Sequence, residues 1–367
     1  MPARDVAEHL SKGIRRIIPD LEIVILPMAD GGEGTVEALV EATSGKIRRV
    51  RAHDPLMRMR DSFYGILGDG STAVIEMAAA SGIELLNESE LDPSATTSYG
   101  TGELIRDALE QGVKKIIIGI GGSATNDGGI GMAMALGIRF LDSEGQEVGR
   151  SGKHLRSIER IDLSGLHERA GEVCYEVACD VDNPLYGEQG AALMFAPQKG
   201  ADEKMARELD EGLKHLADVI HREFGRDISE IPGAGAAGGL GGGLAAFLDA
   251  ELMSGMEIIQ RVTGLEEAIQ RTDLVITGEG KTDRQTQHGK VPAGVAKAAA
   301  KWDKPVVLIS GALEEGYEQL YKIGVDVILP LPEKPVTLDQ ALANAGKYLE
   351  NAGERLIRML LVNGKLG

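Results

Sequence analysis

Carboxylate side chains recur in this sequence at the points where apolar segments end. In an open α/β sheet, ligands bind at the carboxyl ends of the strands, so acidic residues there are candidates for holding a metal ion or accepting a proton. Any one of them could instead cap a helix or form a turn, but five such positions in one chain favour a functional site. The five are Asp30, Asp127, Asp180, Asp182 and Asp283.

Glycine-rich turns surround three of these aspartates. The turns are residues 30–35, 119–129 and 278–283, and they follow the apolar runs 23–26, 116–118 and 274–277. Glycines so placed let backbone N–H groups approach an anion closely, so three such junctions predict phosphate-binding loops that line one shared cleft. The residues that we assign to substrate or nucleotide binding in the first two turns are Asp30, Gly31, Gly32, Gly121, Gly122, Ser123, Thr125 and Asn126.

Lysines and further glycines extend this set. Lys281 and Lys290 flank residues 278–289, and Lys199 follows a Pro-Gln pair. These lysines are placed to meet an anion, although a solvated surface lysine is the ordinary alternative for each. The run 233–243 allows close approach either of a nucleotide or of one helix to another. We add to the binding set Asp180, Asp182, Gly235, Gly238, Gly239 and Lys290.

Three known motifs are alternative explanations of the glycine-rich turns at 119–129, 30–35 and 278–283. Gly119-x-Gly121-x-x-Ala124 matches a dinucleotide fingerprint, with Asp142 ending a predicted second strand at 138–141. The polar segment 125–127 weakens that match, because a helix should begin its apolar face there. A Walker-type loop at 280–282 fails because Val275 replaces the required glycine. The third alternative is a kinase of another design, in which glycine loops hold phosphates and carboxylates hold magnesium.

Composition restricts the class of protein further. The chain has 367 residues and a formal net charge of −18, which repels nucleic acids and anionic membranes. Only two cysteines occur, Cys174 and Cys179, which predicts a reducing, cytoplasmic location. No uninterrupted apolar run reaches the roughly 18 residues of a membrane span. The sequence leaves a homo-oligomer open.

Alternating apolar runs and amphipathic helices predict an α/β fold built on a parallel sheet. Residues 62–77 read instead as a hairpin because Asp69-Gly70 suits a tight turn, and 138–271 also depart from the alternation. We therefore predict a Rossmann-like parallel-sheet domain with a second, inserted α/β domain. The first comprises 1–45, 96–132 and 273–367, the second comprises 46–95 and 133–272, and the active site lies in the cleft between them.

The motifs together resemble one known family. The chain is similar to the bacterial type-1 glycerate kinases over nearly its whole length, through six motifs in the same order: 29–35, 121–129, 179–185, 197–201, 232–241 and 277–283. The resemblance implies phosphorylation of D-glycerate with ATP and Mg²⁺, usually to 2-phosphoglycerate, in glycolate, glyoxylate or sugar-acid catabolism. It also implies that an N-terminal strand and its Asp-Ser-Phe-Lys-Gly-like turn are missing here, with a lysine and an aspartate that could contact phosphate and substrate.

The mechanistic hypothesis assigns a role to each group. Backbone amides of 121–125 hold part of the triphosphate or the glycerate carboxylate, Asp127 and Glu279 are the metal candidates, and Lys281 stabilises the charge being transferred. Asp283 orients or deprotonates the glycerate hydroxyl, and Asp127 is counted with Lys281 and Asp283 among the catalytic residues. The alternatives are an NAD-dependent oxidoreductase using 119–124, a kinase of another small sugar acid, and a sugar-acid sensor without turnover.

Overall fold

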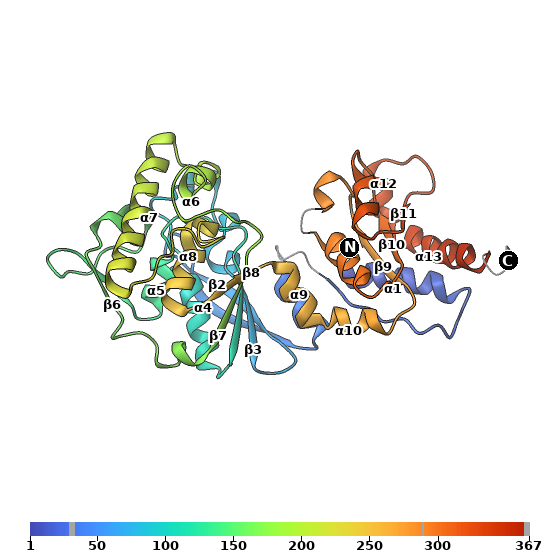
Figure 1. Cartoon of the computed structure of the whole chain (residues 1–367), viewed down its shortest axis with the longest axis horizontal. Coiled ribbons are helices and arrows are strands. Elements are labelled where there is room, and N and C mark those ends of the chain that lie inside the picture. Colours follow the sequence, from blue (N-terminus) through green and yellow to red (C-terminus); the bar gives the residue numbers. More distant parts are fainter. Residues whose placement is uncertain (29–33, 288–289, 363–367) are drawn as a thin grey trace. The chain divides into compact units, whose positions relative to one another are not determined.

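The computed structural model describes residues 1–28, 34–287 and 290–362, and these divide into two compact units (Figure 1). Unit 1 comprises Met1–Asp30 and Ile259–Gly367, and unit 2 comprises Gly31–Ile258. Unit 2 is therefore one continuous segment inserted into unit 1. The predicted turn residues Asp30, Gly31 and Gly32 lie outside the described residues.

Unit 2 is built on a mixed sheet of six strands in the order β1-β2-β3-β4-β7-β8. The first three strands are antiparallel neighbours, and β3, β4, β7 and β8 run parallel. The interior strand β4 is apolar because both its faces are covered by protein. The bounds are β1 Lys46–His53, β2 Met59–Ile66, β3 Thr72–Glu76, β4 Lys115–Gly119, β7 Cys174–Ala178 and β8 Glu251–Met253, with a separate antiparallel pair, β5 Arg139–Leu141 and β6 Arg160–Asp162.

Helices cover this sheet and enclose two hydrophobic cores. One core lies between the sheet and α4, and the other lies beside the long helix α7, around Phe140 and Leu213. Apolar residues of α7 recur every three or four positions, which gives the helix a single buried face. The helices are α2 Thr35–Ala42, α3 Ala78–Ser81, α4 Tyr99–Glu110, α5 Ile130–Ala135, α6 Ala191–Phe195, α7 Glu203–Phe224, α8 Ala236–Leu248 and α9 Gly255–Thr263, the last ending in unit 1.

Unit 1 carries a parallel sheet of three strands in the order β11-β10-β9. Its N-terminal helix packs against its C-terminal helix so closely that a Cβ on Gly13 would lie 1.8 Å from the carbonyl oxygen of Glu350. The bounds are α1 Ala3–Arg15, α10 Leu265–Gln270, α11 Val291–Ala300, α12 Leu338–Ala343, α13 Ala345–Val362, β9 Val275–Glu279, β10 Val306–Ser310 and β11 Val327–Pro330.

The two units confirm the predicted α/β class and an inserted α/β unit, but their boundaries differ from the predicted ones. Residues 96–132 were expected with 273–367, whereas β4 pairs with β3 and β7 inside unit 2. The hairpin of β2 and β3 belongs to that same sheet. An all-apolar run such as 116–118 is suited to the centre of either sheet, so its sequence does not reveal its neighbours.

Smaller expectations differ as well. Residues 23–26, an apolar run expected as a strand, have no regular secondary structure. Helix α4 begins after Ser98, and the C-terminal helical segment is broken at Asn344 into α12 and α13.

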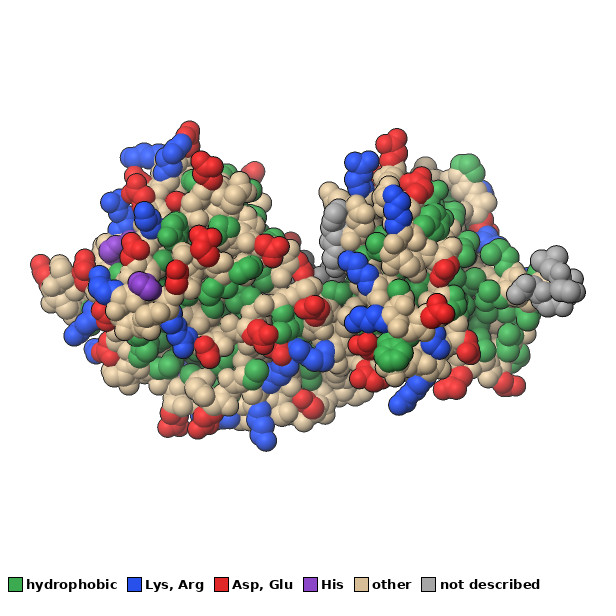
Figure 2. Space-filling view, in the orientation of Figure 1, with side chains coloured by type: hydrophobic (Ala, Val, Ile, Leu, Met, Phe, Trp, Pro, Cys, Tyr) green, Lys and Arg blue, Asp and Glu red, His purple; other side chains and the backbone are tan. Residues whose placement is uncertain are grey.

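The visible surface mixes acidic and basic side chains over both units (Figure 2). Apolar side chains gather at the end of α13, where Met359, Leu360, Leu361 and Val362 are each 44–54% exposed. Among the helices in the described part of the chain, none has the length and apolar character that crossing a membrane requires.

Candidate active site

The loop that follows β4, residues 119–129, is called here the unit 2 loop. Gly121 and Gly122 are exposed, and nothing lies within 4 Å of where a Cβ of Gly121 would stand. Ile83 N–H donates to Gly122 O, and Ala124 N–H donates to Ser81 O, so both sides of the turn are fixed. Within the described residues, the N–H groups of 121–123 have no acceptor, which leaves them available to an anion.

Asp127 closes the base of this loop and is completely buried. Its Oδ2 accepts hydrogen bonds from Ser98 N–H (2.7 Å) and Ser98 Oγ (2.9 Å), with Thr97 Oγ1 at 3.3 Å, and its Oδ1 accepts one from Gly129 N–H (3.1 Å). Burial raises the pKa of this carboxyl, and those hydrogen bonds oppose the rise. The side chain thereby joins the N-terminal ends of α4 and α5.

Two fully buried side chains beside Asp127 lack hydrogen-bond partners. They are Thr125, through its hydroxyl oxygen, and Asn126, through both its amide nitrogen and its amide oxygen. An unpartnered buried polar group costs about 1–3 kcal/mol, so a native protein seldom keeps three such atoms together without a use. These atoms point to a ligand or water in the loop.

Lys199 lies against the same loop from the short 3₁₀ helix Pro197–Lys199. Only 3% of its surface is exposed, and its ammonium nitrogen donates to Ser123 Oγ (2.6 Å) and to Thr125 O (2.7 Å). Burial lowers the pKa of Lys199 to about 7, although the nearby charge of Asp127 opposes this. The sequence placed Lys199 among the anion-facing lysines, but it did not predict the burial or these two contacts.

The glycine run of α8 packs against the unit 2 loop. Gly238 has a φ of +67°, and a Cβ there would lie 2.0 Å from Thr125 O. Gly128 N–H donates to Gly238 O, and a Cβ on Gly239 would meet Gly128 Cα at 2.9 Å. Gly235 likewise packs on Pro184 O. Of the two uses predicted for this run, the contacts show the close approach of one segment to another.

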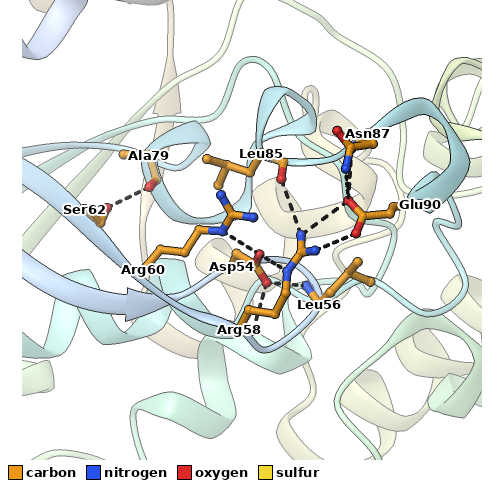
Figure 3. Close-up of polar contacts among 9 residues, drawn as sticks. All are labelled: Asp54, Leu56, Arg58, Arg60, Ser62, Ala79, Leu85, Asn87 and Glu90. Atoms are coloured by element: carbon orange, nitrogen blue, oxygen red, sulfur yellow. Dashed lines mark hydrogen bonds and ion pairs between the residues drawn. The ribbon is translucent and has the colours of Figure 1, made fainter.

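An ion-pair network is centred on Asp54, in the segment between β1 and β2 (Figure 3). Asp54 has a completely buried side chain and accepts from Arg58 Nε (2.6 Å) and Arg60 Nε (2.9 Å). Burial favours the neutral acid, but hydrogen bonds from Arg58 and Leu56 outweigh it and lower the pKa of Asp54. The network fixes residues 54–58, whose Pro55 O accepts Thr97 N–H next to the Asp127 contacts.

The second group of predicted residues lies in unit 1, in the loop 278–283, called here the unit 1 loop. Lys281 Nζ is 3.2 Å from Glu314 Oε2 and 3.6 Å from Asp283 Oδ2, and its side chain is half exposed. The hydrogen bond to Glu314 raises the pKa of Lys281. Gln285 N–H donates to Asp283 (2.8 Å) and, with the charges of Lys290 and Lys281, lowers the pKa of Asp283.

Glu279 lies at the end of β9. Its Oε1 accepts the hydroxyl hydrogen of Thr286 (2.8 Å), and within the described residues its Oε2 has no recorded partner. No group of three or more His, Cys, Asp or Glu side chains suited to a metal ion occurs in the portion of the chain that the structure describes. The two metal candidates, Asp127 and Glu279, belong to different units.

The two remaining aspartates follow β7. Asp180 Oδ1 accepts from Gly255 N–H (3.0 Å) and Ser254 Oγ (3.2 Å), so it caps the start of α9. Asp182 is exposed. These contacts match the ordinary alternative of a helix cap for Asp180.

The predicted strand at 138–141 is present, but it does not lie beside β4 as a dinucleotide fold requires. Residues 139–141 form β5, which pairs antiparallel with β6 in a separate small sheet rather than parallel beside β4. Asp142 instead organises its own turn by accepting the N–H groups of Glu144 and Gln146. A dinucleotide site needs that acid at the end of a parallel neighbouring strand, so the fingerprint at 119–124 is not a dinucleotide site.

The sequence analysis did not identify Ser98 and Thr97, which donate hydrogen bonds to Asp127, or Asp54, which organises the segment that contacts Thr97. The only signal was the polar segment 94–98 directly before an amphipathic helix. That pattern predicts a helix cap, and nothing in it indicates that the cap turns toward Asp127.

The structure is an α/β protein in which two glycine loops follow parallel strands. Backbone N–H groups, lysines and carboxylates lie at these loops, and this combination is typical of proteins that bind phosphate groups. The family described as the glycerate kinase family matches residues 1–361. The chain belongs to the glycerate kinase family, which confirms the resemblance seen in the sequence.

Individual proteins described as glycerate kinases are similar to this chain over most of its length. The chain is 49% identical over 362 residues to glycerate 2-kinase of Escherichia coli K12, covering 99% of this chain and 95% of that protein. It is 48% identical over 356 residues to glycerate kinase of Halalkalibacterium halodurans, covering 97% and 94%. A crystal structure of a protein described as glycerate kinase 2, from Salmonella typhimurium LT2, matches with a TM-score of 0.91 and 46% identity over 99% of this chain and 95% of that one.

Proposed function

We propose that this protein transfers the γ-phosphoryl group of ATP to a hydroxyl of D-glycerate and forms 2-phosphoglycerate. The observation that carries the proposal is the unit 2 loop, where within the described residues the N–H groups of 121–123 have no acceptor and the Ser123 hydroxyl contacts the buried ammonium of Lys199. This arrangement suits an anionic oxygen group. Membership of the glycerate kinase family, and the name of the E. coli relative, support the choice of substrate and product.

The unit 1 loop supplies the groups for the chemical step. Asp283, whose pKa is lowered, is a carboxylate at neutral pH and accepts the proton of the glycerate hydroxyl as that oxygen bonds to the γ-phosphorus. The bond from the γ-phosphorus to the bridging oxygen of ADP breaks in the same transfer. Lys281 is cationic at neutral pH and stabilises the charge on the transferring phosphoryl group.

Magnesium suits one of its two predicted ligands better than the other. Both oxygens of Asp127 already accept hydrogen bonds and the side chain is buried, so Asp127 does not fit a metal ligand. Glu279 fits, because Thr286 orients one carboxylate oxygen and leaves the other without a recorded partner. Bound Mg²⁺ would neutralise charge on the β- and γ-phosphate oxygens.

An ADP-release assay tests the proposal. The protein is incubated with ATP and Mg²⁺ and with D-glycerate, L-glycerate or a panel of sugar acids, and ³¹P NMR identifies the product. Release of ADP with D-glycerate together with a 2-phosphoglycerate signal supports the proposal. Turnover of a sugar acid but not of D-glycerate, or formation of 3-phosphoglycerate, overturns it. We propose a cytoplasmic location, with which the unpaired thiols Cys174 and Cys179 agree.

A further inference from the structure

One of the two hydrogen bonds of Lys199 fixes the role of the Ser123 hydroxyl. An ammonium group can only donate hydrogen bonds, so Ser123 Oγ, at 2.6 Å from Lys199 Nζ, accepts. The Ser123 hydroxyl hydrogen is therefore free to donate elsewhere. Ser123 is only partly buried and stands directly after the exposed Gly121 and Gly122. Its hydroxyl thus adds a side-chain donor to the three unpaired N–H groups of 121–123.

The second hydrogen bond fixes the backbone of the same loop. Thr125 O accepts from Lys199 at 2.7 Å and lies where a side chain on Gly238 would clash. This carbonyl is hydrogen-bonded to Lys199 and packed against Gly238, which restricts the backbone at Thr125. Lys199 therefore links Ser123, next to the exposed Gly121 and Gly122, with Thr125 at the buried end of the loop.

The charge of Lys199 lacks a direct counter-ion. Asp127 is close enough to favour the charged form, but its oxygens are occupied by Ser98, Thr97 and Gly129. A buried cation without a paired anion is costly, and an anion bound at 121–123 would remove much of that cost. Burial lowers the pKa of Lys199 to about 7, so anion binding would also favour uptake of a proton.

We propose that Lys199 is a positioning residue that aims the Ser123 hydroxyl and the 121–123 amides at an anionic oxygen group and supplies the positive charge of that subsite. This inference rests on the proposed function for the source of the anion, which is either the carboxylate of the acid substrate or a phosphate of the nucleotide. The subsite does not include Asp283 or Lys281, so it affects binding of one substrate more than the chemical step.

Substitution of Lys199 shows whether the bound anion is the carboxylate of the acid substrate or a phosphate of the nucleotide. Isothermal titration of the full chain with D-glycerate alone and with ATP alone is combined with KM values for both substrates in wild type, Lys199→Met and Lys199→Arg. We expect Lys199→Met to weaken binding of one substrate at least about tenfold while the other changes less than about twofold. Lys199→Arg should recover part of the loss, because it keeps the charge. The affected substrate identifies the anion.

Ser123→Ala provides the second variant, and it keeps the proposal testable if Lys199→Met fails to fold. Ser123→Ala removes one of the two acceptors of the buried Lys199 ammonium, so we expect a small drop in melting temperature together with weaker binding of the same substrate. In the double variant the losses should combine to less than the product of the single effects, since one residue acts through the other. Lys204→Met is the matched control, because it removes an exposed lysine paired only with Glu208.

Unchanged affinity for both substrates in folded Lys199→Met, or in Ser123→Ala, overturns the inference. Equal weakening of both substrates overturns it too, since that would indicate a general structural role. The titrations do not require turnover. If wild type binds D-glycerate or ATP through Lys199 yet releases no ADP with D-glycerate, the proposed function fails and this inference stands.

Discussion

The unit 2 loop and the unit 1 loop share one sequence pattern, an apolar strand followed by glycines and an aspartate, but they are built differently. In the unit 2 loop Asp127 is buried, as is Lys199 beside the loop, and both carboxylate oxygens of Asp127 accept hydrogen bonds from protein donors. In the unit 1 loop Lys281 is half exposed and is paired with carboxylates at 3.2 and 3.6 Å. The same pattern thus gives a buried, hydrogen-bonded aspartate in one unit, and in the other a partly buried aspartate beside a half-exposed lysine.

Under the proposed function, this difference suits one loop to binding and the other to the chemical step. Buried, hydrogen-bonded groups have fixed positions, which suits binding, whereas exposed charged side chains can adjust to a reacting group. Substitutions in the unit 2 loop should therefore change stability or affinity, and those in the unit 1 loop should change turnover with little effect on folding.

The largest effect is expected from Asp283→Asn. The amide cannot accept the hydroxyl proton, so kcat should fall by a factor of about 10² to 10⁴, while the melting temperature stays unchanged. Steady-state kinetics and thermal unfolding measure the two quantities. Asp273→Asn, at an exposed aspartate of the same unit, is the control. A kcat within a factor of two of wild type would remove Asp283 from the mechanism.

Gly238→Ala should be the most destabilising change in the unit 2 loop region. The new Cβ would meet Thr125 O at 2.0 Å in a backbone of φ +67°, so we expect a loss of about 3 kcal/mol in unfolding free energy, combining left-handed strain with overpacking. Gly225→Ala is the matched control because it has the same φ and open space around it. It should cost only about 1 kcal/mol. Equal losses in both variants would contradict the close packing.

Stability should depend on pH through Lys199. Its pKa is lowered to about 7 in the folded chain against 10.5 unfolded, so between these values the unfolded state holds the extra proton. Stability from this group therefore rises with pH from about 7 to 10, by at most about 1.4 kcal/mol per pH unit. Urea unfolding at several pH values should show this rise in wild type and a flatter curve in Lys199→Met. Identical curves would show that Lys199 has an ordinary pKa. Asp127 is the charged neighbour that acts on it.

The smallest effect is expected from Gly121→Ala. Nothing within 4 Å obstructs a Cβ and the φ is not positive, so folding should be unchanged. The methyl group would stand beside the exposed N–H groups and should raise the KM of one substrate by about three- to tenfold. A lower melting temperature with unchanged KM would indicate a structural loop rather than a receptor.

The positions of individual strands could be predicted from the sequence better than their neighbours in the sheet. Apolar runs and the Asp-Gly turn located β4, β7 and the β2–β3 hairpin, because strand periodicity and turn chemistry are local. The assignment of β4 to a sheet failed, since Ile116, Ile117 and Ile118 are equally suited to the interior of either sheet. For the site, glycines located both loops. The burial of Lys199 and the anchoring of Asp127 by Ser98 depend on long-range packing, so no local pattern indicated them.

The pairing of α1 with α13 has a consequence for synthesis on the ribosome. Residues 3–15 emerge before unit 2, but the helix that they pack against, residues 345–362, emerges after it. Unit 2 is complete in the chain once residue 258 has emerged and can fold before the rest is made. Leu10 and Ile14 are buried in the folded protein. During synthesis these apolar side chains therefore lack the packing surface of α13 while more than 300 residues are translated.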